Sequence, residues 1–179
     1  MPWTPIVGRG FTRDEIGQYV SGVLKTAWSP SFPVLHNTAA PRLDQWHSVP
    51  GADRMRNLAS YYQSKGWSRG PHFFVADDLI WAFTPITTHG VHSPSWNGIS
   101  VGVEMVGDYS VEPFNQGKGA NVRDNAVALL TALCRRYRWQ SGDLKLHKED
   151  PLTTHKDCPG LAVSKADMIR RIHESLANT

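Results

Sequence analysis

Cysteine is scarce in this chain, with 2 residues in a total of 179. Two cysteines cannot form the disulfide framework that stabilises many small secreted domains. Apolar runs are short, and none approaches the roughly 18 residues that a membrane-spanning helix requires, so we expect no integral membrane association. The first residues also lack a basic segment followed by an apolar one, and we expect no secretory signal peptide.

Charge of one sign is limited as well. Lys and Arg form no run of the kind that follows a phosphate backbone, and the formal net charge is only +3. The sequence therefore does not predict a nucleic-acid-binding protein, although a pI of about 9.0 suits an anionic polymer as partner. With 40% hydrophobic and 20% charged residues, the composition is typical of a soluble globular protein. We expect one domain over residues 1–179, and a monomer.

Hydrophobic periodicity alternates between helical and strand patterns along the chain. The Pro- and Gly-containing residues 1–11 predict an extended N-terminal arm, and residues 40–51 predict an irregular segment. Apolar positions at helical spacing predict helices over 12–27, 52–65, 123–138 and 164–176. Short apolar runs predict strands over 32–36, 72–76, 79–83, 99–106 and 144–147. This alternation indicates an α/β fold with a central mixed sheet of about five strands, flanked by helices, and a groove at one sheet edge.

The segment from His147 to Gly160 gathers side chains that bind metals. It contains His147, His155 and Cys158 in a chain that is otherwise poor in cysteine. A zinc site needs about four ligands, and a catalytic zinc leaves one of these positions to water. The segment supplies part of such a set, and we expect a further ligand from a distant part of the chain. The alternative for Cys158-Pro159-Gly160 is a plain turn with a buried thiol.

Two further polar residues stand where apolar strands are predicted. His36 ends one strand, where the crevice of an α/β sheet opens, although a hydrogen-bonded core histidine is the plainer interpretation. Glu104 is the single charge in the middle of another strand, where a carboxylate is costly to bury unless it is paired or functional. Neutral imidazoles with a thiolate suit Zn²⁺, and a nearby carboxylate can move a proton during amide hydrolysis.

These motifs, taken in order, resemble those of the zinc-dependent N-acetylmuramoyl-L-alanine amidases. The motifs are Val34-Leu-His-Asn-Thr38, the His72-Phe-Phe strand, the His89 loop leading into Asn97-Gly-Ile-Ser-Val-Gly-Val-Glu104, and His147 with Lys156-Asp-Cys-Pro-Gly160. That family includes amidase-type phage endolysins, muropeptide-recycling amidases and peptidoglycan recognition proteins. The resemblance covers roughly residues 30–175, which is nearly the whole chain.

The resemblance also implies roles for single residues. It implies that His36, His147 and Cys158 hold Zn²⁺. It places on Lys156 the family's lysine, whose proposed role is to stabilise an oxyanion, and on Glu104 the acidic residue of the recycling members.

One position departs from part of the family. The phage and recognition members carry a tyrosine just before the His-Phe strand, where this chain has Pro71. Proline has no side-chain proton to give. The departure strengthens Glu104 as the acid/base and puts a role for tyrosine in doubt.

The remaining histidines near the motifs have competing interpretations. His155 lies three residues before Cys158 and competes with His147 as a ligand. The spacing and the strand-end position favour His147, which leaves His155 at the rim or hydrogen-bonded behind a ligand. We expect His72 to be a structural histidine of its strand.

Loop and tryptophan residues are candidates for substrate contacts. We predict that His89 and Trp96 bind substrate, with a satisfied histidine and ordinary packing as the alternatives. For His92 a satisfied histidine is the favoured interpretation. Trp46 and Trp67 are candidates, with Trp96, for a wall that faces glycan or peptide, and packing is the alternative for each.

The implied reaction is hydrolysis of the amide that joins N-acetylmuramic acid to L-alanine, with peptidoglycan or a muropeptide as partner. We expect a phage endolysin that accumulates in the host cytoplasm and reaches the cell wall by holin-type release. The alternatives are a cytoplasmic recycling amidase acting on soluble anhydro-muropeptides, a non-catalytic peptidoglycan-binding protein, and a structural zinc protein. Cys158 argues against the binding protein, and a closed fourth coordination position would favour the structural zinc.

Overall fold

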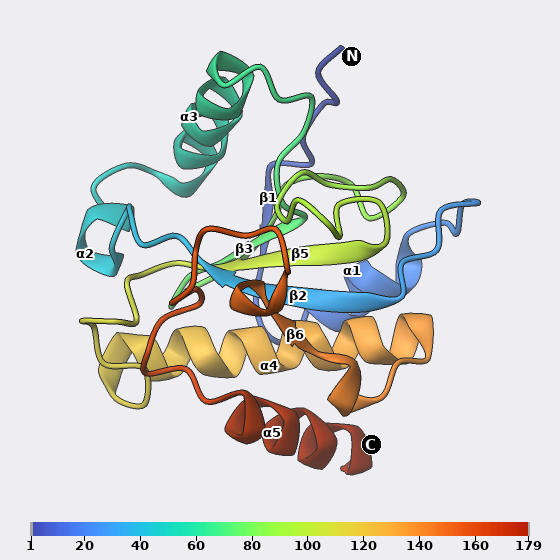
Figure 1. The fold of residues 1–179 in the computed structure, drawn as a ribbon, viewed down its shortest axis with the longest axis vertical. Helices are drawn as coiled ribbons and strands as arrows, with labels where there is room; N and C mark the ends of the chain where they lie inside the picture. The colour runs from blue at the N-terminus through green and yellow to red at the C-terminus, as the bar shows by residue number, and fades with distance from the viewer. Residues whose placement is uncertain (1, 179) are drawn as a thin grey trace.

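The computed structural model describes residues 2–178. Its centre is a six-stranded sheet (Figure 1). The strands are β1 (Arg9–Phe11), β2 (Phe32–Asn37), β3 (Phe73–Val75), β4 (Ile80–Ala82), β5 (Ser100–Met105) and β6 (Lys145–Leu146). Their order across the sheet is β1-β4-β3-β5-β2-β6. Strands β3, β5, β2 and β6 are parallel, and β4 pairs antiparallel with both β3 and β1. The expected α/β fold with a mixed sheet is confirmed.

The neighbouring strands β2 and β5 are apolar on both faces, as parallel strands covered on both sides must be. In β2, Val34 and Leu35 are fully buried, and so are Val101 and Val103 in β5. β2 and β5 pair over their whole length. Their register places the predicted ligand of β2 directly beside Glu104 of β5.

Helices cover the sheet in layers (Figure 1). They are α1 (Ile16–Gly22), α2 (Leu43–Trp46), α3 (Gly51–Ser64), α4 (Gly117–Tyr137) and α5 (Lys165–Ala177), with short 3₁₀ turns at Ser141–Asp143 and His147–Glu149. Helix α4 packs its apolar side against the sheet, and α5 lies on the outer side of α4. Helix α3 stands on the opposite side of the sheet from α4 (Figure 1). None of the helices in residues 2–178 is long and apolar enough to cross a membrane.

The sheet has six strands, and not about five, because part of the predicted N-terminal arm joins it. Residues Arg9–Phe11 pair with β4, with Arg9 opposite Ala82. A Cβ at Gly10 would lie 3.0 Å from the Leu79 side chain, so this position of the edge strand is tightly packed. Three residues are too few for a period-2 pattern to stand out, which is why the sequence indicated only an arm.

The five predicted strands are correct to within one residue at either end, but two helices differ. Helix α1 covers Ile16–Gly22 and not residues 12–27. At its end, the Arg136 guanidinium donates to the carbonyls of Val20 and Val23, at 2.6 and 2.8 Å. Helix α4 begins at Gly117, six residues earlier than predicted. A Cβ at Gly119 would lie 1.9 Å from the Pro113 carbonyl oxygen, so close backbone packing explains a helix start that propensity argues against.

The segment 40–51 contains one helical turn that the sequence did not indicate. Helix α2 covers Leu43–Trp46, and its first and last residues are both buried. Packing of these two apolar side chains into the core outweighs the weak local signal. The turn leads into α3, which forms one side of the groove described below.

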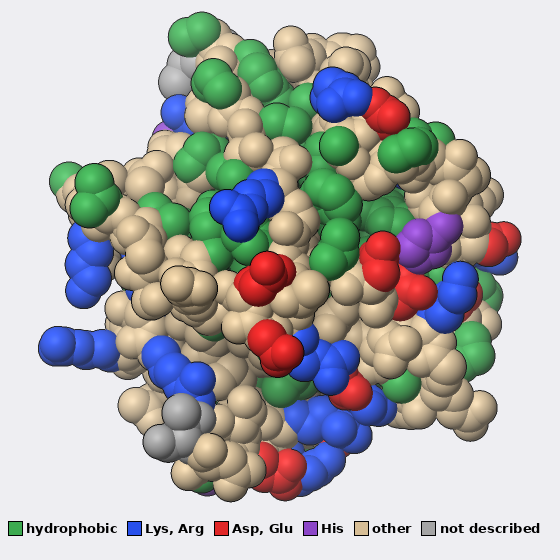
Figure 2. Space-filling view, turned by 180° about the vertical axis from the view of Figure 1, so that it is seen from behind, with side chains coloured by type: hydrophobic (Ala, Val, Ile, Leu, Met, Phe, Trp, Pro, Cys, Tyr) green, Lys and Arg blue, Asp and Glu red, His purple; other side chains and the backbone are tan. Residues whose placement is uncertain are grey.

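Figure 2 shows the molecule from behind, and charged side chains of both signs are scattered over this face. On α5, Asp167 pairs with Arg170 and Arg171, and Arg170 also pairs with Glu174. Exposed pairs of this kind stabilise a protein only weakly. They give α5 a surface of alternating charge and not a continuous basic stripe.

Candidate metal centre and groove

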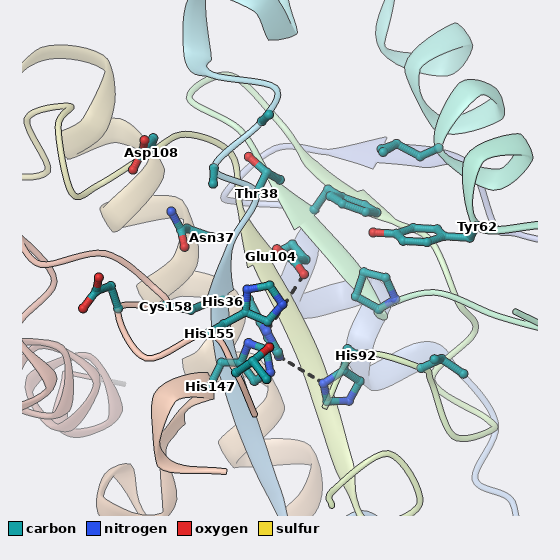
Figure 3. Close-up of a pocket in the computed structure, with 18 of the residues that line it drawn as sticks. His36, Asn37, Thr38, Tyr62, His92, Glu104, Asp108, His147, His155 and Cys158 are labelled. Atoms are coloured by element: carbon teal, nitrogen blue, oxygen red, sulfur yellow. Dashed lines mark hydrogen bonds and ion pairs between the residues drawn. The ribbon is translucent and has the colours of Figure 1, made fainter. Parts of the chain in front are cut away.

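The three predicted ligands meet at one edge of the sheet (Figure 3). His36 is near the end of β2, and His147 follows β6 directly, so parallel pairing of the two strands brings both imidazoles to the same edge. Cys158 is drawn in by the chain segment after β6, whose Lys148 amide donates to the Cys158 carbonyl at 3.1 Å. One ligand atom from each of the three residues lies within 4.8 Å of the other two. The structure thus assembles a group that could hold a metal ion.

The electrostatic setting of the group suits a cation. Burial lowers the pKa of His36 well below its usual value, and it lowers the pKa of His147 to about 4, so both rings are neutral and present lone pairs. Burial, assisted by the nearby Glu104 carboxylate, raises the pKa of the Cys158 thiol to about 12. A thiolate here therefore needs a positive partner, and a metal ion supplies one.

The choice between two histidines, left open by the motif, is made by the fold. His155 is exposed and lies outside the three-residue group, stacking its ring on that of His147 at 5.4 Å. It is a rim residue. Lys156 is also exposed, and it lines the same groove.

Glu104 faces the metal-binding group from the neighbouring strand. Its Oε1 lies 4.0 Å from Nδ1 of His36. Burial raises the pKa of this carboxyl to about 8 in the metal-free protein. A carboxylate so placed can exchange a proton near neutral pH, which is what an acid/base residue requires.

A groove of about 530 Å³ opens over the group. One side is formed by the end of β2 and the 154–158 loop, and the other by α3 and the turn after it. Tyr62 and Trp67 lie on the α3 side with their rings stacked at 5.1 Å, and Tyr61 extends beside them. The groove is thus a channel with a potential metal-binding group in its floor and aromatic rings along one wall.

Tyr62 is a groove residue that the sequence did not indicate. Figure 3 shows its hydroxyl directed toward Glu104. Burial, with the negative charge of Glu104, raises the pKa of this phenol well above its usual value, so it stays protonated. Its helical spacing with Met55 and Ala59 indicates only that it belongs to the buried face of α3. That pattern carries no information about the hydroxyl at the end of its ring.

Only some of the other aromatic and histidine candidates line the groove. Among residues 2–178, the lining of the groove includes Trp67 but neither His89 nor Trp96. The His89 ring contacts the Arg69 guanidinium at 2.7 Å, and Trp96 packs edge-to-face on Phe32 at 5.4 Å. Their contact with substrate stays a prediction. Trp46, by contrast, is a core residue, only 2% exposed.

A buried carboxylate ties the two loops at the site together. Asp150 accepts hydrogen bonds from the hydroxyls of Ser93 and Ser95, both at 2.5 Å, and from the Ser95 amide at 3.0 Å. Its own amide donates to the His147 carbonyl at 3.0 Å. These bonds lower the pKa of Asp150 to about 2 despite its burial. The loop before β5 is thereby fastened to the segment that carries His147.

A second group of potential metal-binding side chains lies elsewhere on the surface. It consists of His47, Asp77 and Asp78. His47 Nε2 and Asp77 Oδ1 are already 2.6 Å apart, which is a hydrogen bond and too short for two ligands of one ion. This contact links α2 to the β3–β4 hairpin and needs no metal.

The fold and this group define a class: an α/β protein with a His-His-Cys group, at the carboxyl ends of its parallel strands, that could hold a metal ion. A family model described as N-acetylmuramoyl-L-alanine amidase matches residues 27–161. The chain belongs to this family, as its motifs predicted. No match was found among curated protein sequences.

Several solved structures share the fold. The N-acetylmuramoyl-L-alanine amidase LysC from Clostridium intestinale is 20% identical, with a TM-score of 0.67 over 96% of this chain and 92% of that one. The Ph2119 endolysin from a Thermus scotoductus bacteriophage is 25% identical, with a TM-score of 0.62 over 88% of this chain and 96% of that one. Drosophila PGRP-LB is 21% identical, with a TM-score of 0.64 over 86% and 87%. At such identities, these likenesses establish the fold.

Proposed function

We propose that this chain is a zinc-dependent N-acetylmuramoyl-L-alanine amidase. It hydrolyses the amide between the lactyl group of N-acetylmuramic acid and L-alanine in peptidoglycan. The observation that carries the proposal is the meeting of His36, His147 and Cys158 in a groove beside Glu104. Membership of the amidase family supports the type of reaction.

The donor set fits zinc. Two neutral imidazoles and one thiol are borderline-soft ligands, and three protein ligands is the number used by catalytic zinc sites. Zinc, when bound, supplies a Lewis acid that polarises the scissile carbonyl and acidifies water. His36, His147 and Cys158 would hold it at the floor of the groove, where substrate can reach it.

Two side chains of the groove perform the remaining steps. Glu104 accepts the proton of the attacking water and returns it to the leaving nitrogen, so that the C–N bond breaks and a free amine departs. Lys156 lies at the exposed rim of the same groove, where its ammonium group can face the carbonyl oxygen as negative charge develops there.

The test compares two variants of the site with a cysteine control outside it, on purified sacculi. Cys158→Ser and Glu104→Ala are expected to abolish release of peptides with a free N-terminal L-alanine, because each loses a group that the reaction needs. Cys134→Ser, which alters the buried thiol of α4, is expected to keep the activity. Circular dichroism verifies that each variant is folded. Normal turnover by either of the first two variants would refute the mechanism.

The biological setting that we propose is a phage endolysin. The proposal is supported by the likeness to proteins described as endolysins. The same proposal includes accumulation of the protein in the host cytoplasm, followed by holin-type release to the cell wall. Glu104 favours a second candidate, a recycling amidase, because the resemblance places an acidic residue of those members at this position. Comparing rates on intact sacculi and on soluble anhydro-muropeptides separates the two. An endolysin is expected to prefer sacculi, and a strong preference for the soluble substrate would favour recycling.

A further inference from the structure

His92 lies directly behind one of the ligands. It comes from the loop before β5, is only 9% exposed, and places its Nδ1 3.0 Å from Nε2 of His36 (Figure 3). The two rings are nearly perpendicular, with centroids 5.1 Å apart. His92 is outside the group of three potential ligands, and its contact is with His36.

The hydrogen bonds of His92 determine which ring nitrogens carry protons. Its Nε2 faces the carbonyl of Ser100 at 3.5 Å and the Ser100 hydroxyl oxygen at 3.4 Å. That hydroxyl donates to the Trp96 carbonyl, so toward His92 it can only accept. Nε2 of His92 therefore carries the proton, and in a neutral, buried imidazole Nδ1 is then an acceptor.

The same reasoning extends one ring further. Since Nδ1 of His92 accepts, Nε2 of His36 must donate, and the proton of the His36 ring lies on Nε2. The lone pair of His36 then resides on Nδ1, the atom that lies 4.0 Å from Glu104. His147 also has a partner at its Nε2, the Thr153 hydroxyl oxygen at 2.9 Å, which donates or accepts according to the tautomer of the ring.

The backbone around His92 is built to hold the ring in place. A Cβ at Gly102, in the middle of β5, would lie 2.4 Å from the His92 ring, so this strand position has to be glycine. The Asn97 side chain accepts from the His92 and Ser93 amides at 2.6 and 2.8 Å. The ring is thus fixed by the strand on one side and by the loop on the other.

We propose that His92 is a positioning residue that holds His36 in its Nε2–H tautomer and so keeps the Nδ1 lone pair available to the metal. This inference rests on the proposed function only in taking His36 as a ligand. A partner that fixes the tautomer of a ligating histidine is worth about 10- to 100-fold in metal affinity. His92 also lines the groove, and the role proposed for it here is to orient the ligand.

The first test uses the unaltered, metal-free protein. Long-range ¹H–¹⁵N correlation spectra distinguish protonated from unprotonated ring nitrogens, and His36 is expected to be protonated at Nε2 and His92 at Nε2. Protonation of His36 at Nδ1 would overturn the proposal. Because no zinc is needed, this result stands even if the protein proves not to be an amidase.

The second test compares zinc affinities by competition with a chelator. His92→Leu removes the acceptor and is expected to weaken zinc binding about 10- to 100-fold and to mix the His36 tautomers. His92→Asn, whose side-chain oxygen can occupy the place of Nδ1, is expected to restore most of the affinity. Affinity and tautomer that are both unchanged in His92→Leu would overturn the proposal.

A matched control separates positioning from packing. His72 is a neighbouring buried histidine whose ring bonds to the Thr88 carbonyl and the Gly102 amide. It packs edge-to-face on His92, with ring centroids 5.9 Å apart, and lies outside the group of potential ligands. His72→Leu is expected to lower the melting temperature but to leave zinc affinity and the His36 tautomer unchanged. Equal losses of zinc affinity in His72→Leu and His92→Leu would show that His92 acts only through packing.

Discussion

Glu104 combines two features at the scale of a single residue: it is half-buried within an apolar strand, and it faces the imidazole of a predicted ligand. Its pKa of about 8 lies above the value of 4.5 for an unperturbed glutamate. The folded, metal-free protein therefore binds this proton more tightly than the unfolded chain does. The resulting stabilisation is full below about pH 4.5 and is lost as the pH rises toward about 8.

Glu104→Gln should remove that pH dependence, because glutamine does not titrate. In the presence of a chelator, the variant is expected to gain free energy of unfolding relative to the unaltered protein as the pH rises from about 5 to about 8. Urea denaturation at several pH values measures the difference. Parallel stability curves for the two proteins would contradict the raised pKa.

Lys156 offers a second test at this scale. Lys156→Met is expected to lower kcat by about 10²- to 10³-fold with little change in KM, because the lost charge would act on the transition state and not on bound substrate. The matched control is Lys118→Met, an exposed lysine of α4 outside the groove. Equal effects of the two substitutions on kcat would remove Lys156 from the mechanism.

Single residues of the site were predictable to different degrees. His36, His147 and Cys158 could be found because a resemblance in motif order singled them out, and the fold brings them together. The hydrogen bond from His36 to His92 could not be found, because it depends on how a loop folds back over β5. No local sequence pattern encodes such a contact.

At the scale of the elements, the Asp150 clamp joins the loop before β5 to the segment after β6. Asp150→Asn is expected to lower the free energy of unfolding by about 2–3 kcal/mol. The neutral amide would replace a carboxylate that accepts charge-assisted hydrogen bonds from Ser93 and Ser95. The control is Asp14→Asn, an exposed aspartate. Urea denaturation distinguishes them, and equal stabilities would contradict the clamp.

The pH dependence of this clamp has the opposite sign to that of Glu104. Asp150 has a pKa of about 2 in the folded protein, below its ordinary value of 3.8. The stabilisation is therefore present above about pH 3.8 and is lost as the pH falls toward 2. Asp150→Asn should flatten the acid side of the stability curve.

The first turns of helix α4 contain a close backbone contact between Gly119 and the Pro113 carbonyl. A substitution at Gly119 tests whether this contact explains the early start of the helix. Gly119→Ala is expected to destabilise the protein by about 1–3 kcal/mol, because the added carbon would collide with the Pro113 carbonyl. Gly17→Ala in α1 is the control, with open space around the position, and is expected to stabilise by about 0.5–1 kcal/mol. Thermal melts compare the two, and shifts of the same sign would contradict the contact.

Element bounds were predictable where periodicity dominated and were missed where tertiary contacts decide. Strands β2 and β5 follow from their apolar runs, whereas β1 and α2 are too short for a pattern. The end of α1 coincides with hydrogen bonds from Arg136, more than a hundred residues away in the sequence. Such long-range contacts are invisible to local propensity.

At the scale of the whole molecule, one topological fact creates the site. β2 lies between β5 and β6, all three parallel, so that their carboxyl ends share one edge of the sheet. The α/β class and this clustering could be predicted from the sequence. Trp67 of the aromatic wall was a candidate from the sequence. The tyrosines of α3 could not be placed there, because helical periodicity does not reveal which element a helix faces.

The most direct measurement identifies the bond that is cut. Purified sacculi are digested with zinc-loaded protein, and the soluble products are analysed by mass spectrometry and by N-terminal labelling. The expected result is stem peptides that begin with free L-alanine, together with peptide-free glycan chains without new reducing ends, and no release after a chelator. New reducing ends, cleavage within the stem peptides, or undiminished release in the chelator would contradict the proposed amidase.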